Sequence, residues 1–121
     1  MNLEAAMPFR SSDSLLPLTP IAFEILLALA EEERHGYAIL QAVESRLRGK
    51  LPLRTGTLYR ALARLVEDGL IEELDAAPGT DTRRRTYRIS RHGRSIARAE
   101  TERMADQVAA ARSRKLLPGR S

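Results

Sequence analysis

The chain has 121 residues and a mass of 13.5 kDa, which suits one small domain and leaves little room for a second. It contains no cysteine, so disulfide scaffolds, thiolate zinc sites and cysteine nucleophiles are excluded. Twenty basic against sixteen acidic residues give a charge of +4. No apolar run approaches the ~18–20 residues that span a bilayer, and no export signal is apparent, so we expect a cytoplasmic protein without membrane contact.

The basic residues are unevenly distributed along the chain. From Asp81 to Arg103 there are eight arginines and three acidic residues, whereas Glu31–Glu33 and Glu67–Asp75 are acidic stretches. This asymmetry indicates one face that attracts anions. A solvated, arginine-rich surface is the alternative explanation, but the distribution favours nucleic-acid binding.

Residues 1–17 hold scattered apolar residues, two prolines and a Ser-Ser-Asp-Ser run, and we expect them to form a flexible N-terminal arm. Thr19 and Pro20 then begin a first helix, because threonine is a favoured N-cap and proline suits the first helical position. The helix should end near Glu33. Its apolar residues fall on one face: Ile21, Ile25, Leu26 and Leu29.

A short break at His35-Gly36-Tyr37 precedes a second helix, which Gly49 stops. Thr55 is predicted to cap a third helix that ends at Gly69. The spacing of its leucines indicates one buried face made of Leu58, Leu62 and Leu65.

Two short strands are predicted next, at residues 70–74 and 86–89, joined by a long turn around residues 77–81. Ser90 caps a last helix over residues 91–117, and residues 118–121 form a tail. The order of elements predicts an α+β, mostly α fold. Residues 18–90 would form a winged helix-turn-helix of three helices plus a two-stranded wing, followed by a long C-terminal dimerisation helix.

The third helix and the wing supply the candidate DNA-binding residues. A helix that reads the major groove needs a polar face of hydroxyls and arginines, and a wing contacts phosphates. We expect DNA contacts from Thr55, Thr57, Tyr59, Arg60, Arg64, Arg83, Arg84 and Arg85. The alternatives are an ordinary amphipathic helix, a Tyr59 that belongs to the core, and a charged edge strand that guards against aggregation.

Several blocks together resemble the PadR family of transcriptional regulators over roughly residues 18–100. The blocks are His35-Gly36-Tyr37, Gly56-Thr57-Leu58-Tyr59, Gly69-Leu70-Ile71, and residues 84–90 with Gly93. The resemblance implies a winged-helix DNA-binding protein, usually a repressor, that dimerises through its C-terminal helix. It also implies an effector, and a pocket for it would lie between the long helices and the domain, near Met104.

The last helix shows a candidate dimerisation seam. A helix of about 26 residues would span ~39 Å, which exceeds the small domain that it would cover. Small and apolar residues recur along it at spacings of four and three: Ala97, Thr101, Met104, Val108 and Ala111. We therefore expect a homodimer. This stripe could instead pack on the first helix of its own chain, and an interface around Ile21 and Ile25 is the other arrangement.

No set of convergent catalytic groups is apparent, so we predict that the chain is not an enzyme and needs no cofactor or metal. His35 and His92 are the only histidines, and no glycine-rich phosphate loop is present. We expect double-stranded DNA as the partner. A winged-helix module that docks an acidic protein partner is the main alternative. An RNA binder that stacks bases is less favoured, because the chain has only five aromatic residues.

Overall fold

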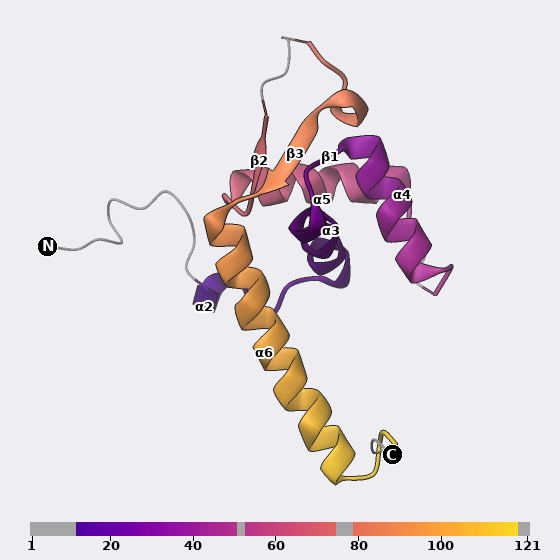
Figure 1. Cartoon of the computed structure of the whole chain (residues 1–121), viewed down its shortest axis with the longest axis vertical. Helices are drawn as coiled ribbons and strands as arrows, with labels where there is room; N and C mark the ends of the chain where they lie inside the picture. Colours follow the sequence, from indigo (N-terminus) through magenta and orange to yellow (C-terminus); the bar gives the residue numbers. More distant parts are fainter. Residues whose placement is uncertain (1–11, 51–52, 75–78, 119–121) are drawn as a thin grey trace, which may run out of the picture.

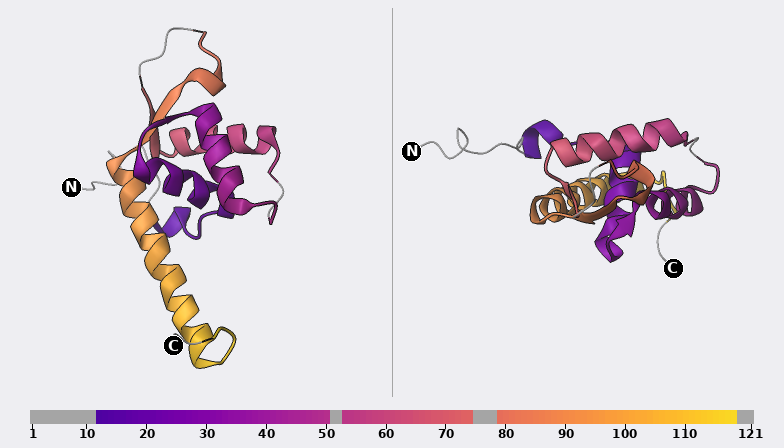
Figure 2. Two further views of the ribbon diagram at one scale, coloured as in Figure 1. Left: turned by 45° about the vertical axis from the view of Figure 1, so that its right-hand side comes forward. Right: turned by 90° about the horizontal axis from the view of Figure 1, so that it is seen from above.

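The computed structural model describes residues 12–50, 53–74 and 79–118. A central helix, α3, packs between α5 on one side and α6 on the other (Figure 1, Figure 2). The strands project a wing from one end of the molecule, and α6 projects from the other. The elements in chain order are α2 (Ser12–Leu15), α3 (Pro20–Glu31), β1 (Arg34–His35), α4 (Gly36–Leu47), α5 (Thr55–Glu67), β2 (Ile71–Glu73), η1 (Thr82–Arg84), β3 (Thr86–Ile89) and α6 (Arg91–Ser113).

The core confirms the helical periodicity seen in the sequence. The leucines of α5 that were assigned to the buried face are all shielded from solvent, and they pack with apolar residues of α3, α4 and the wing. The N-caps of α3 and α6 are also confirmed: Thr19 Oγ1 accepts a hydrogen bond from the Ala22 amide, and Ser90 Oγ accepts one from the Gly93 amide. The helices therefore begin where the sequence indicates.

The predicted cap of α5 is wrong by one residue. Thr55 is the first helical residue, and Arg54 occupies the N-cap position without a side-chain capping bond. The Arg54 carbonyl already accepts a hydrogen bond from the Leu58 amide, 3.1 Å away, which places Arg54 at the start of the helix. The side chain of Thr55 is therefore exposed and does not cap the helix.

The wing is part of a three-stranded antiparallel sheet with the order β1-β3-β2, so the prediction of a two-stranded wing is incomplete. The segment interpreted as a break contains β1, in which Arg34 pairs with Tyr87 and His35 pairs with Thr86. The Gly36 amide then donates to the Arg85 carbonyl. This pairing fixes the start of α4 against the wing.

The predicted arm and the predicted last helix are both shorter in the structure. Residues 12–15 are helical and Leu15 is buried in the core, so the prediction of a flexible arm is wrong for this part. Residues 1–11 lie outside the described residues. The apolar side chain of Leu15 gains burial only by folding back onto the domain. Helix α6 ends at Ser113 rather than residue 117, because Lys115 adopts a left-handed conformation with φ +61°.

A close backbone contact joins the start of α6 to the end of α5. A Cβ at Gly93 would lie 2.0 Å from the carbonyl oxygen of Leu70, so no larger residue fits there. Ser90 reinforces the contact, since its hydroxyl donates to the Gly69 carbonyl and its amide donates to the Leu70 carbonyl. Gly93 therefore sets how α6 leaves the domain.

Substitution of Gly93 with alanine should destabilise the protein strongly, because the clash is with backbone that cannot rotate away. We expect a loss of ~3 kcal/mol, at the upper end of overpacking effects, and a fall in Tm of ~10 °C in thermal unfolding. Gly56→Ala is the matched control, since its added Cβ would meet only the end of a flexible arginine at 3.5 Å. Equal Tm values for both variants would contradict the close contact.

Candidate nucleic-acid interface

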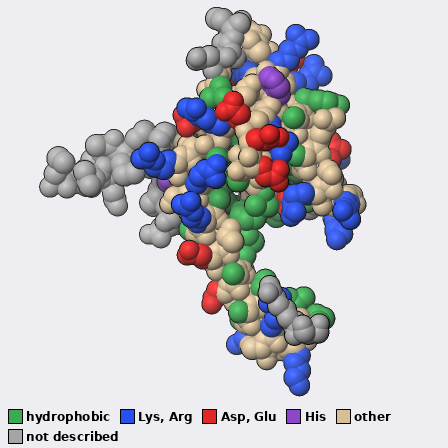
Figure 3. Space-filling model, viewed as in Figure 1, with side chains coloured by type: hydrophobic (Ala, Val, Ile, Leu, Met, Phe, Trp, Pro, Cys, Tyr) green, Lys and Arg blue, Asp and Glu red, His purple; other side chains and the backbone are tan. Residues whose placement is uncertain are grey.

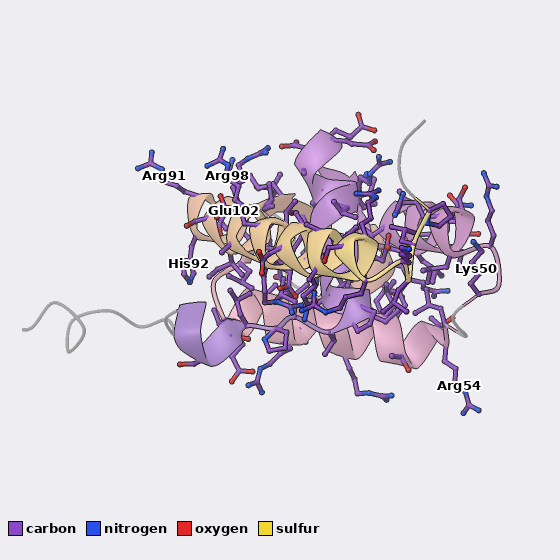
Figure 4. All side chains as sticks on the ribbon, turned by 90° about the horizontal axis from the view of Figure 1, so that it is seen from below. Lys50, Arg54, Arg91, His92, Arg98 and Glu102 are labelled. Atoms are coloured by element: carbon purple, nitrogen blue, oxygen red, sulfur yellow. The ribbon has the colours of Figure 1, made fainter. Side chains whose placement is uncertain are left out.

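The start of α5 presents a polar, cationic surface. Lys50 and Arg54 come from the connection between α4 and α5 and point away from the body of the protein (Figure 4). Thr55, Gly56 and Arg60 are exposed on the helix that follows. The buried leucines anchor the opposite face, so this surface is held outward by the core.

The two predicted arginines of α5 differ in their surroundings. Arg60 is exposed, and among the described residues no carboxylate lies within ion-pair distance of it. Arg64 is also exposed, but its Nε lies 3.2 Å from Asp68 Oδ2. The Asp68 side chain is only 12% exposed, so this carboxylate holds the Arg64 guanidinium at the edge of the protein surface.

Thr57 and Tyr59 are half-buried, unlike Arg60. Thr57 is half-buried on the side of α5 that faces the start of α3. Tyr59 packs against the core, and its hydroxyl is buried without a hydrogen-bond partner among the described residues. Burial raises the pKa of Tyr59, against the opposing effect of the positive charge of Arg83. Tyr59 therefore contacts the core, which was the alternative to a DNA contact for this residue.

The three consecutive arginines of the wing have three different environments. They do not lie along a strand, because residues 82–84 form a short 3-10 helix. Arg83 pairs with Asp81 at 3.2 Å, and Arg85 is half-buried, with its Nε donating to the Thr80 carbonyl. Arg84 is exposed, and no carboxylate of the described residues pairs with it. Figure 3 shows the basic side chains that gather at this tip.

Two residues to which the sequence assigned no role lie where the wing meets α4, and His35 is bonded to the wing. The His35 Nδ1 lies 3.0 Å from the Arg84 carbonyl oxygen and 3.0 Å from Thr86 Oγ1. Tyr37, in the first turn of α4, is 53% exposed. The signal for both was the His35-Gly36-Tyr37 block, whose pairing partners lie about fifty residues further along the chain.

The comparison with known families decides the class of protein. A sequence model of the transcriptional regulator PadR-like family matches residues 25–99. The chain belongs to this family. It is a PadR-like transcriptional regulator with a DNA-binding winged-helix fold, which confirms the resemblance seen in the sequence and argues against an enzyme.

Solved structures of regulators share the fold. A transcriptional regulator from Clostridium thermocellum is 27% identical with a TM-score of 0.64, over 86% of this chain and 96% of that chain. A PadR family transcription regulator from Clostridium difficile is 22% identical with a TM-score of 0.63, over 78% and 97%. Bacillus subtilis PadR in complex with operator DNA is 22% identical with a TM-score of 0.57, over 69% of this chain and 46% of that chain. No curated protein sequence matches significantly.

The predicted dimerisation residues of this PadR-like chain divide into two groups. Ile25 is fully buried in the core of its own protomer, so its assignment to an interface is wrong, and Ile21 is half-buried against that core. Ala97 also packs on the core, as the alternative of packing within the chain requires. Further along α6, Thr101 and Val108 are exposed while Met104 and Ala111 are half-buried.

The structure also bears on membranes and metals. Within residues 12–50, 53–74 and 79–118, no helix is long and apolar enough to cross a membrane. The same residues contain no group of three histidine, aspartate or glutamate side chains that could hold a metal ion.

Tyr59→Phe tests whether the Tyr59 hydroxyl takes part in DNA binding. Removing a buried hydroxyl that has no partner relieves its desolvation penalty, so we expect the variant to be more stable by ~1 kcal/mol in urea unfolding. DNA affinity should stay within twofold of the wild type in a fluorescence anisotropy titration. A loss of stability, or a tenfold loss of affinity, would show that the hydroxyl has a partner in the functional state.

Proposed function

We propose that this PadR-like protein is a repressor that binds an inverted-repeat operator as a symmetric homodimer and is released by a small-molecule effector. The observation that supports the dimer most strongly is the position of α6. This helix is about 35 Å long, and its C-terminal half extends beyond the domain (Figure 1). Val108 on this half is 40% exposed.

Pairing α6 with its copy would cover these side chains. Figure 3 shows hydrophobic side chains where α6 leaves the domain and again near its end. A two-fold axis would place the two α5 helices in equivalent positions. The expected operator therefore has two half-sites about 34 Å apart, or a multiple of that spacing.

In this proposal α5 enters the major groove and the wing contacts phosphates. Arg60 and Arg84 are the arginines most free to bind a phosphate or a base, because neither is paired with a carboxylate of the described residues. Thr55 and Arg64 flank Arg60 on α5 and are exposed. Arg83 would exchange Asp81 for a phosphate, and Arg85 mainly supports the wing through its bond to the Thr80 carbonyl.

Substitution of Arg84 with alanine should weaken binding to all DNA sequences. One lost phosphate contact reduces the slope of log affinity against log salt by ~0.9. The measurement is a DNA titration at several salt concentrations. Arg98→Ala is the control, because Arg98 is exposed on α6, on the side opposite α5 (Figure 4). An unchanged slope for Arg84→Ala, with the fold intact by circular dichroism, would remove the wing from the interface.

Met104→Glu tests the dimer. Two like charges near each other in a desolvated interface are strongly unfavourable, so the variant should sediment as a monomer. It should lose most of its affinity for a full operator and keep weak binding to a half-site. Ala109→Glu is the control, because Ala109 is exposed on the same helix outside the predicted seam. A wild-type protein that sediments as a monomer at micromolar concentration would refute the dimer.

A further inference from the structure

A pocket of about 460 Å³ lies beside α5, on the side that faces α2 and the start of α3. Both α2 and the C-terminal half of α5 contribute residues to its lining. The buried side chains of Leu15, Leu65 and Leu70 contribute to its lining. The volume falls within the range of small-molecule sites, about 300–1,000 Å³. This is an apolar site within a single protomer, and it does not include Met104.

The polar groups of the lining come mainly from α5. Thr57, Arg60 and Arg64 all belong to it. Among the described residues, the only carboxylate of the lining is Asp68, whose side chain is 12% exposed and is already paired with Arg64. Arg60 therefore supplies a positive charge that no carboxylate of the described residues neutralises. An apolar pocket with one unpaired guanidinium suits an anion with an apolar body.

The lining also distinguishes between kinds of apolar body. Among the described residues, no aromatic side chain lines the pocket, so none of them offers a planar ring a stacking partner there. The apolar residues described in the lining are leucine, alanine and proline. Their aliphatic side chains pack well against a flexible alkyl chain. Together with Arg60, this composition favours an aliphatic monocarboxylate over an aromatic one.

One side of the pocket is held in place by α6. The Leu18 amide donates a hydrogen bond of 2.8 Å to Glu100 Oε2, and Glu100 is itself buried and bonded to Arg103. Leu18 and its neighbour Pro17 both line the pocket. A site held in this way is preformed, so a ligand need not order the segment on binding.

We propose that this pocket binds a medium-chain aliphatic carboxylate, with the carboxylate on Arg60 and the alkyl chain on the leucines. The proposal rests on the function proposed above, because Arg60 would also contact DNA. A ligand bound to Arg60 and DNA exclude one another, so the carboxylate acts as the effector that releases the operator. The effector site then lies at the reading helix itself, rather than between the long helices.

The first experiment measures binding without DNA. The protein is titrated by calorimetry with decanoate and decylammonium, each below its micelle concentration, and with 1-decanol below its solubility limit. Decanoate should bind at least ~10-fold more tightly than the alcohol, as one charge-assisted contact predicts, and decylammonium should not bind. Arg60→Ala should reduce decanoate to the affinity of the alcohol. Absence of decanoate binding, or equal affinity for the three probes, would overturn the proposal.

The second experiment connects the pocket to DNA. Ala22→Leu places extra volume in the pocket from α3 without changing α5, and Ala30→Leu adds the same volume to an exposed position of α3 outside this pocket. Decanoate should lower operator affinity at least fivefold for the wild type and Ala30→Leu, and have no effect on Ala22→Leu. Both variants should bind DNA normally without decanoate.

The outcomes separate this proposal from the function on which it rests. Decanoate that binds but leaves operator affinity unchanged overturns its role as an effector. Decanoate that releases DNA from Ala22→Leu as it does from the wild type overturns the location. If no variant binds DNA under any condition, the proposed repressor function fails, and the calorimetry still decides whether the pocket takes the carboxylate.

Discussion

The rest of the structure depends on the contact between Gly93 and the Leu70 carbonyl. At this point the first turn of α6 lies directly against the chain as it leaves α5. The Ser90 hydroxyl links the two segments. It accepts a hydrogen bond from the Gly93 amide, which caps α6, and it donates one to the Gly69 carbonyl just after α5. The direction of α6 is thus tied to the end of α5. If two α6 helices pair in a dimer, a change in their packing would shift α5 as well, because the backbone contact at Gly93 is rigid.

Glu100 provides the second tie, between α6 and the N-terminal segment. Its side chain is almost fully buried, a costly place for a carboxylate without partners. The hydrogen bond from Arg103, with a further one from the Leu18 amide, lowers the pKa of Glu100 despite its burial. The stabilisation is therefore present above the usual carboxylate pKa, near ~4.3, and is lost as the pH falls through the lower folded value. The hydrogen bond from the Leu18 amide thus ties the segment between α2 and α3 to α6.

Local patterns predicted most of the fold, and long-range pairing accounts for what they missed. The leucine spacing of α5 and the caps Thr19 and Ser90 depend on residues within one or two helical turns, so the sequence displays them directly. Strand β1 has only two residues, which is too short for any periodicity, and its partners are about fifty residues away. The bond between Leu18 and Glu100 spans 82 residues. The sequence of the arm contains no sign of it, since only the folded chain brings the two together.

For the candidate DNA contacts, the sequence shows which residues are polar or basic. It does not show which of their side chains are exposed and unpaired. Tyr59 is a polar residue on a polar helix, yet its hydroxyl is directed into the protein. Arg83, Arg84 and Arg85 look equivalent in sequence, yet their immediate neighbours divide them into a paired, an unpaired and a half-buried side chain. Under the proposed function a paired arginine can still contact DNA, because an exposed ion pair is weak enough to exchange its carboxylate for a phosphate. In the proposed DNA complex, Arg83 would leave Asp81 for a phosphate, whose hydrogen bonds to guanidinium are stronger and geometrically better matched.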